Sequence, residues 1–134
     1  EVTLQFVPFA RRRYEILRVS VTDADPREAL EAALPQWTAD DLYRIILTGE
    51  TDERGVDLTA LETLFSGRFY ALELRDQTRV RQDVWDRAGE DSLRGEFLRR
   101  LRRQFDAARD EQERERVTRA VRFGLAALDH RDIL

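Results

Sequence analysis

Several residue types are missing from this sequence of 134 residues. It contains no cysteine, methionine, lysine or asparagine, and its one histidine, His130, lies near the C-terminal end. Without cysteine the chain can form neither disulfides nor thiolate zinc sites, which suits a reducing cytoplasm. No apolar run approaches the ~20 residues needed to cross a membrane, and no signal-peptide pattern is present.

The sequence also lacks a nucleophile–base pair, a cluster of metal ligands and a phosphate-binding loop. We therefore expect no catalytic residue, no metal ligand and no cofactor in this chain, and we expect His130 to be a solvated terminal side chain. Because the chain begins at Glu1 and contains no methionine, we interpret it as a piece of a longer polypeptide whose chemistry lies elsewhere.

Charged residues make up 37% of the chain, against ~25% in an average globular domain. All basic residues are arginine, which keeps its charge and can bind a phosphate or carboxylate with paired hydrogen bonds. Residues 1–90 contain 12 arginines and 18 acidic residues, whereas residues 91–134 contain 11 arginines and 9 acidic residues. An acidic first section followed by a mildly basic tail indicates two parts.

The first section, residues 1–76, alternates strand and helix patterns. Four segments have the apolar patterns of strands: residues 2–9, 14–21, 42–48 and 68–74. Asp25 and Asp57 are typical helix caps, and the helix after Asp25 should end before Pro35. This order predicts an α+β fold with a small sheet of about four strands and two short helices on one face.

The remainder is predicted to be a connector, residues 77–91, followed by an antiparallel helical hairpin, residues 92–134, whose first helix is capped by Ser92. Two apolar stripes at helical spacing should face each other: Leu93, Phe97, Leu101, Phe105 and Ala108, and Val117, Ala120, Val121, Gly124 and Leu128. A glycine within a helix costs about 1 kcal/mol relative to alanine, so Gly124 indicates a close approach of the two helices. Trp37 and Trp85 are expected to pack against the sheet or the hairpin.

Five sequence blocks, taken in order, resemble a known family: FVPFARRRYEILRVSV, RIILTGET, RFYALELRDQT, SLRGEFLRRL and VRFGLAALDHRDI. They are similar to the C-terminal region of bacterial SbcD-like DNA-repair exonucleases, in the calcineurin-like metallophosphoesterase superfamily. The resemblance spans nearly the whole chain. It implies that residues 1–76 are a capping domain and that the helical tail docks an SMC-like ATPase.

The resemblance also implies a parent enzyme that cleaves DNA with manganese in a separate phosphoesterase domain, through which it could form a homodimer. The signature motifs of that domain are absent from this chain, so no catalytic residue is carried over. Arg11, Arg12 and Arg13 become candidates for weak DNA contact. The candidates for partner docking are Leu98, Arg99, Arg102, Arg103 and Phe123.

Other readings of the same residues stay open. The arginine triplet fits an ordinary charged corner between strands, and the tail arginines fit a solvated helix face. The whole chain could be a free-standing protein-interaction module unrelated to DNA, or a small enzyme that uses carboxylates alone. An upstream phosphoesterase domain in the full gene product would favour the exonuclease reading.

Overall fold

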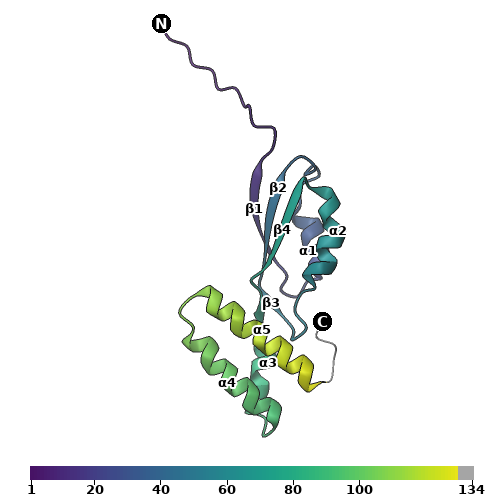
Figure 1. Ribbon diagram of the computed structural model, residues 1–134, viewed down its shortest axis with the longest axis vertical. Coiled ribbons are helices and arrows are strands. Elements are labelled where there is room, and N and C mark those ends of the chain that lie inside the picture. The colour runs from purple at the N-terminus through teal and green to yellow at the C-terminus, as the bar shows by residue number, and fades with distance from the viewer. Residues whose placement is uncertain (130–134) are drawn as a thin grey trace.

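A parallel three-stranded sheet forms one half of the computed structural model, which describes residues 1–129 (Figure 1). The strands are β1 (Tyr14–Ser20), β2 (Leu42–Thr48) and β4 (Ala71–Asp76), in the spatial order β1–β2–β4. Tyr14 pairs with Leu42, and Leu42 pairs with Ala71, so the strands start level with one another. The α+β class is confirmed, and so is the strand predicted over residues 42–48.

Two helices cover the same face of this sheet (Figure 1). They are α1 (Pro26–Ala33), between β1 and β2, and α2 (Leu58–Phe65), which precedes β4. The chain crosses the sheet in one direction, and crossovers between parallel strands are almost always right-handed, so both helices arrive on one side. The predicted placement of two helices on one face therefore holds.

Both helices begin at the predicted caps. The carboxylate of Asp25 accepts a hydrogen bond from the backbone N–H of Arg27, and that of Asp57 accepts one from Ala60. The first helix ends at Ala33, before Pro35, as expected. The core between helices and sheet consists of Val19, Val21, Leu30, Leu34, Tyr43, Ile45, Leu47, Leu61, Phe65 and Phe69.

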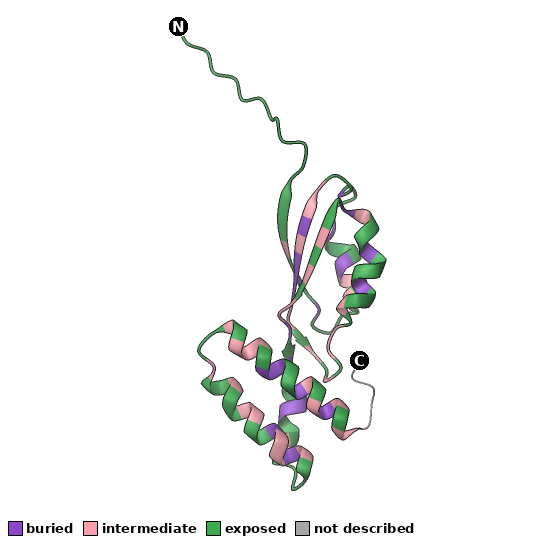
Figure 2. Ribbon diagram, in the orientation of Figure 1, coloured by how far each residue is buried: buried purple, intermediate pink, exposed green. Residues whose placement is uncertain are grey.

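No described helix covers the opposite face of the sheet (Figure 2), and this face carries the charged side chains of Arg44, Glu73 and Arg75. Parallel sheets usually have both faces covered. Here Glu73 accepts hydrogen bonds from Arg44 at 2.7 Å and from Arg75 at 2.8 Å. Arginine stems are apolar and can cover their neighbours, and Ile46, on this face of the central strand, is buried. The charged side chains therefore cover part of this face, whereas Tyr14 and Ile16 of β1 remain more than half exposed.

The strand predicted over residues 2–9 is wrong. Residues 1–13 form no strand and extend away from the sheet (Figure 1), and their apolar side chains, among them Leu4, Phe6 and Phe9, are exposed. A strand needs a hydrogen-bonding partner, and β1 pairs only with β2 among the described strands. Apolar alternation in the sequence shows which side chains a strand could bury, but it does not show whether a neighbouring strand is present to pair with it.

The second half is mainly helical. Its link to the sheet is a two-stranded parallel pair, β3 (Glu50–Thr51) with β5 (Arg79–Val80). Its helices are α3 (Gln82–Asp86), α4 (Leu93–Ala107) and α5 (Glu111–Leu128), and the short 3-10 turns of the described chain are η1 (Ser66–Arg68) and η2 (Arg87–Gly89). None of the helices within residues 1–129 is long and apolar enough to span a membrane.

Residues 79–91 contribute directly to this second half. Val80, Val84 and Trp85 pack in a hydrophobic cluster with Leu98, Val117, Val121 and Leu125. The rings of Trp85 and Phe105 lie 5.7 Å apart, centroid to centroid. The segment interpreted as a connector is therefore an integral layer of the core, and the prediction that Trp85 is packed is confirmed.

The apolar stripe predicted for α4 needs correction. Leu93, placed in the stripe, is 73% exposed, whereas Leu98, placed outside it, is fully buried. The reason is that α4 packs against η2 and α3 as well as against α5, which the spacing within one helix cannot reveal. The predicted close approach at Gly124 is confirmed, since a Cβ at that position would overlap the ring of Phe97.

Candidate functional site

Arg11, Arg12 and Arg13 are exposed just before β1, at the end of the sheet where all three strands begin. The guanidinium of Arg12 lies 3.8 Å from the centroid of the Tyr70 ring. The backbone N–H of Arg13 donates to a carboxylate oxygen of Asp41 at 2.9 Å. Within the described part of the chain, no carboxylate forms an ion pair with any of these three guanidiniums.

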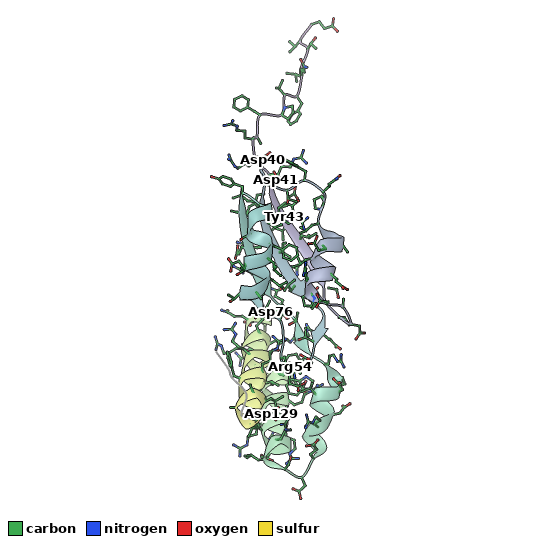
Figure 3. All side chains as sticks on the ribbon, turned by 90° about the vertical axis from the view of Figure 1, so that its right-hand side faces the viewer. Asp40, Asp41, Tyr43, Arg54, Asp76 and Asp129 are labelled. Atoms are coloured by element: carbon green, nitrogen blue, oxygen red, sulfur yellow. The ribbon has the colours of Figure 1, made fainter. Side chains whose placement is uncertain are left out.

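Two exposed aromatic side chains occupy the same end of the sheet. Trp37 is 71% exposed and Tyr70 is 59% exposed, so the prediction that Trp37 packs against the sheet or the hairpin is wrong. The indole N–H of Trp37 points to Asp40 at 3.4 Å, and Figure 3 shows Asp40 and Asp41 at this end of the molecule. Trp37 follows Pro35 outside any periodic apolar pattern, and that position was the available signal for exposure.

The tail residues proposed for docking serve mainly internal roles. Leu98 has no exposed surface, so a partner cannot contact it while this core is intact. Arg99 donates to the backbone carbonyl of Ala88 at 2.8 Å and thereby holds η2 against α4. Arg102 forms an ion pair with Asp106 and lies over the Trp85 ring. Arg103 is exposed, and no described side chain bonds it.

Carboxylates balance part of the arginine-rich surface of α4. Glu96 binds both Arg99 and Arg100, and these hydrogen bonds lower the pKa of the Glu96 carboxyl, with Arg99 the larger cause. Similarly, hydrogen bonds from Arg75 and then Arg44 lower the pKa of Glu73 on the open face of the sheet. Both carboxylates therefore stay ionised to lower pH than usual.

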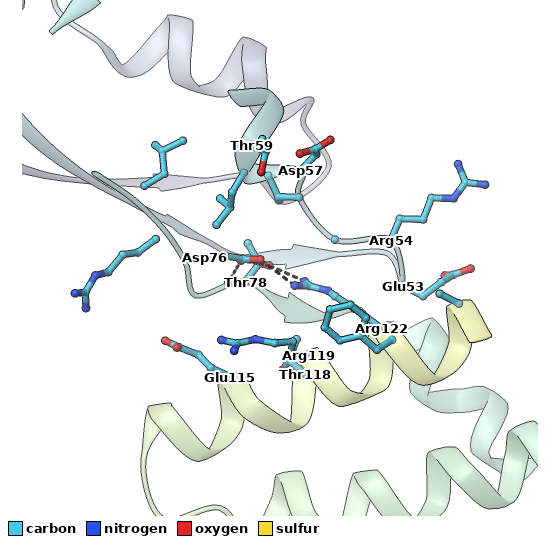
Figure 4. A pocket seen from close by; sticks show the side chains of 17 residues that line it. Glu53, Arg54, Asp57, Thr59, Asp76, Thr78, Glu115, Thr118, Arg119 and Arg122 are labelled. Carbon is cyan, nitrogen blue, oxygen red and sulfur yellow. Dashed lines mark hydrogen bonds and ion pairs between the residues drawn. The ribbon is translucent and has the colours of Figure 1, made fainter. Parts of the chain in front are cut away.

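Phe123 lines a cleft between the two halves of the molecule (Figure 4). The cleft has a volume of about 990 Å³, and its walls come from the loop before α2, the end of β4 and one side of α5. Phe123 is 49% exposed there. Arg54 and Arg119 also line the cleft, as do the acidic residues Glu53 and Glu115, so its walls carry charges of both signs.

Arg122 closes the inner end of this cleft. Its guanidinium donates to Asp76 at 2.9 Å, to the Thr51 hydroxyl at 2.7 Å and to the Thr78 hydroxyl at 2.7 Å (Figure 4). These partners lie at the end of β4, in β3 and just before β5. One side chain of α5 therefore joins the helical half to the sheet, a role that the sequence pattern did not indicate.

Groups of three or more side chains with metal-binding chemistry do not occur within the described residues. His130, expected to be solvated, lies outside them. Comparisons with protein-family models, with curated proteins and with solved structures find no match to this chain.

Proposed function

We propose that this chain is a non-catalytic C-terminal domain of a metal-dependent DNA-repair exonuclease that acts in the cytoplasm. In this proposal the domain positions DNA for the nuclease and docks an SMC-like ATPase. The ordered resemblance of five sequence blocks to SbcD-like exonucleases supports it. The resemblance implies that a separate phosphoesterase domain of the parent enzyme would hold the manganese.

The observation that carries the DNA-positioning part is the exposure of Arg11, Arg12 and Arg13 side by side without carboxylate partners. Exposed arginines that are free of ion pairs can bind phosphate oxygens without first breaking an internal contact. The net charge of the chain is −4, so the rest of the surface repels DNA. Binding should therefore be weak, local to this end and strongly dependent on salt.

The helical half supports the partner-docking part. As a helical hairpin, α4 and α5 would present Phe123 and the cleft beside it to a coiled coil of the ATPase. Helices commonly dock by inserting an apolar face into such a groove. Phe123→Asp should then abolish co-purification with the ATPase and leave the chain folded, because the ring is about half exposed. Survival of the complex would exclude Phe123 from the docking surface.

A charge-matched pair of variants tests the DNA-positioning part. In one variant, alanine replaces Arg11, Arg12 and Arg13. In the other, alanine replaces Arg27, Arg103 and Arg116, which are also exposed and form no ion pair among the described residues. Both variants lose three positive charges. In DNA titrations at several salt concentrations, the affinity of the Arg11, Arg12 and Arg13 variant should depend less steeply on salt. The magnitude of its negative slope of log affinity against log salt should fall by about 2 to 3. Equal effects of the two variants would contradict the proposal.

The alternative is a free-standing protein-interaction module. It is favoured by the exposed apolar residues at the N-terminal end, including Leu4, Phe6 and Phe9, which no described residue covers. Exposed apolar patches commonly mark protein interfaces. If the chain binds no DNA at low salt, and the gene product lacks a phosphoesterase domain, this alternative replaces the first.

A further inference from the structure

Trp37 and Tyr70 are large aromatic side chains displayed beside the arginine triplet, although both belong to residue types that are usually mostly buried. Trp37 belongs to the loop between α1 and β2, and Tyr70 directly precedes β4. The two side chains therefore reach the same end of the sheet from different crossovers. We call Arg11, Arg12, Arg13, Trp37 and Tyr70 the arginine–aromatic end.

Hydrogen bonds hold the two aromatic segments in fixed relation. The buried hydroxyl of Thr38 donates to the backbone carbonyl of Arg68 at 2.6 Å, and the N–H of Tyr70 donates to the carbonyl of Asp41 at 3.0 Å. The side chain of Asp41 in turn accepts the backbone N–H of Arg13. These hydrogen bonds fix the backbone of the segments that carry the exposed rings. Little backbone conformational entropy would therefore be lost when the rings bind a ligand.

The chemistry of this end combines flat π surfaces with guanidinium groups. Arg12 already stacks on one face of Tyr70, which leaves the planar guanidinium as a further surface for stacking. Proteins bind single-stranded nucleic acid by stacking unpaired bases on aromatic rings and arginine planes while basic side chains contact the phosphates. A base-paired duplex hides those base faces.

We propose that the arginine–aromatic end binds unpaired DNA, with bases stacked on Trp37 and Tyr70 and phosphates held by the arginine triplet. This inference rests on the proposed function in taking DNA as the partner. It adds that the domain prefers a single-stranded segment over a duplex. For an exonuclease accessory domain, such a segment would be a strand separated near a DNA end.

Nearby carboxylates set the strength of binding. Asp40 and Asp41 lie at the same end, and each already accepts a hydrogen bond, from the Trp37 indole and from the backbone of Arg13. Glu15 is a further acidic neighbour, since its charge acts on Tyr43 together with those of Asp41 and Arg13, so binding by the three guanidiniums should be weak. If all three arginines contact phosphates, the slope of log affinity against log salt for single strands should be about −2.

Tryptophan fluorescence gives a direct test, because Trp37 is exposed and the other tryptophan, Trp85, is buried. The 134-residue chain is titrated with a twelve-nucleotide oligo-dT and with a duplex of the same length. Oligo-dT should quench the emission of Trp37, and the same quenching should persist in Trp85→Phe. Binding of oligo-dT without any change in Trp37 emission would overturn the stacking.

Variants read by the anisotropy of labelled oligonucleotides complete the test. Trp37→Leu and Tyr70→Leu should each weaken oligo-dT binding about tenfold and change duplex binding less than twofold. Tyr70→Phe retains the ring and should bind normally. Leu93→Ala, which alters an exposed apolar side chain outside this end, is the control and should leave the affinity unchanged. Equal affinity for oligo-dT and duplex, or full affinity in both leucine variants, would refute the inference.

The outcomes separate this inference from the proposed function. If the alanine variant of the arginine triplet weakens binding of both DNA forms while the leucine variants bind normally, the domain contacts DNA through phosphates alone. In that case the proposed function stands and the stacking fails. If the unmodified chain binds neither DNA form at low salt, both fail together.

Discussion

At the scale of single residues, Arg122 is expected to contribute strongly to stability. Its guanidinium joins α5 to Asp76, Thr51 and Thr78 of the sheet half. Arg122→Met keeps the length of the side chain but leaves Asp76 without its cationic partner in a partly buried position. Removing one member of a buried pair is strongly destabilising, so we expect a loss of about 2 to 4 kcal/mol in the free energy of unfolding. Urea denaturation followed by circular dichroism measures this loss.

Arg119→Met provides the matched control for that experiment. Arg119 is one helical turn away on α5, exposed, and forms no ion pair with the described residues. Its replacement should change the free energy of unfolding by less than about 0.5 kcal/mol. A similar loss in both variants would mean that Arg122 stabilises α5 itself and does not join the two halves.

The carboxylate of Glu73 predicts how stability depends on pH. Hydrogen bonds from Arg75 and Arg44 lower the pKa of Glu73 in the folded chain below its ordinary value of 4.5. A carboxyl group whose pKa is lower in the folded chain than in the unfolded chain stabilises the fold. This stabilisation is fully present above the unfolded pKa and is lost as the pH falls through the folded pKa. Stability should therefore decline below about pH 4.5. In Glu73→Gln, thermal melts measured over this acidic range should show a smaller decline, with Glu62→Gln as the exposed control.

Residue by residue, the sequence predicts capping and strand interiors well and predicts exposure poorly. The caps Asp25, Asp57 and Ser92 act through neighbours two or three positions away, so local sequence is sufficient to identify them. Leu98 could not be placed in the same way, because its burial depends on packing against α3 and α5. For Trp37, the position after Pro35 outside any apolar pattern was a local signal of exposure.

At the scale of elements, the close packing of α4 against α5 depends on Gly124. A methyl group at this position would overlap the Phe97 ring. The gain in helix propensity from glycine to alanine is about 1 kcal/mol, but overpacking a core typically costs about 1 to 3 kcal/mol. Gly124→Ala should therefore be neutral to destabilising, by up to about 2 kcal/mol, despite its better intrinsic propensity.

Gly67→Ala supplies the comparison for Gly124. Nothing lies within 4 Å of a Cβ at Gly67, and its backbone conformation is open to other residues. This substitution should be neutral or slightly stabilising in the same thermal melts. If Gly124→Ala proved the more stabilising of the two, the close contact with Phe97 would not exist in solution.

Among the elements, strands long enough to carry an apolar pattern could be predicted from the sequence, whereas the two-residue strands could not. The run over residues 42–48 is apolar enough to identify a central strand. The two-residue strands β3 and β5 carry no pattern of their own, because each exists only through pairing with the other. Likewise the helix α3 is too short for a periodic signal, although its Trp85 anchors the second core.

At the scale of the whole molecule, the two hydrophobic clusters should unfold together. They are joined by the β3–β5 pair and by the bonds of Arg122. Trp85 emission reports the second cluster and far-ultraviolet circular dichroism reports the entire fold. In Trp37→Phe, where Trp85 is the remaining tryptophan, the two signals should give one denaturant midpoint. Separate midpoints would show that each cluster is a domain in its own right.

The parallel pairing of the three long strands also bears on how the chain reaches this fold. Each strand pairs with one about 28 residues away, so no strand can form by closing a short hairpin. By contrast, α4 and α5 are separated by three residues. Pairing across long loops is slow because the entropy of closure is lost before contacts compensate it. On a ribosome, the complete three-stranded sheet would therefore have to wait until β4 had emerged.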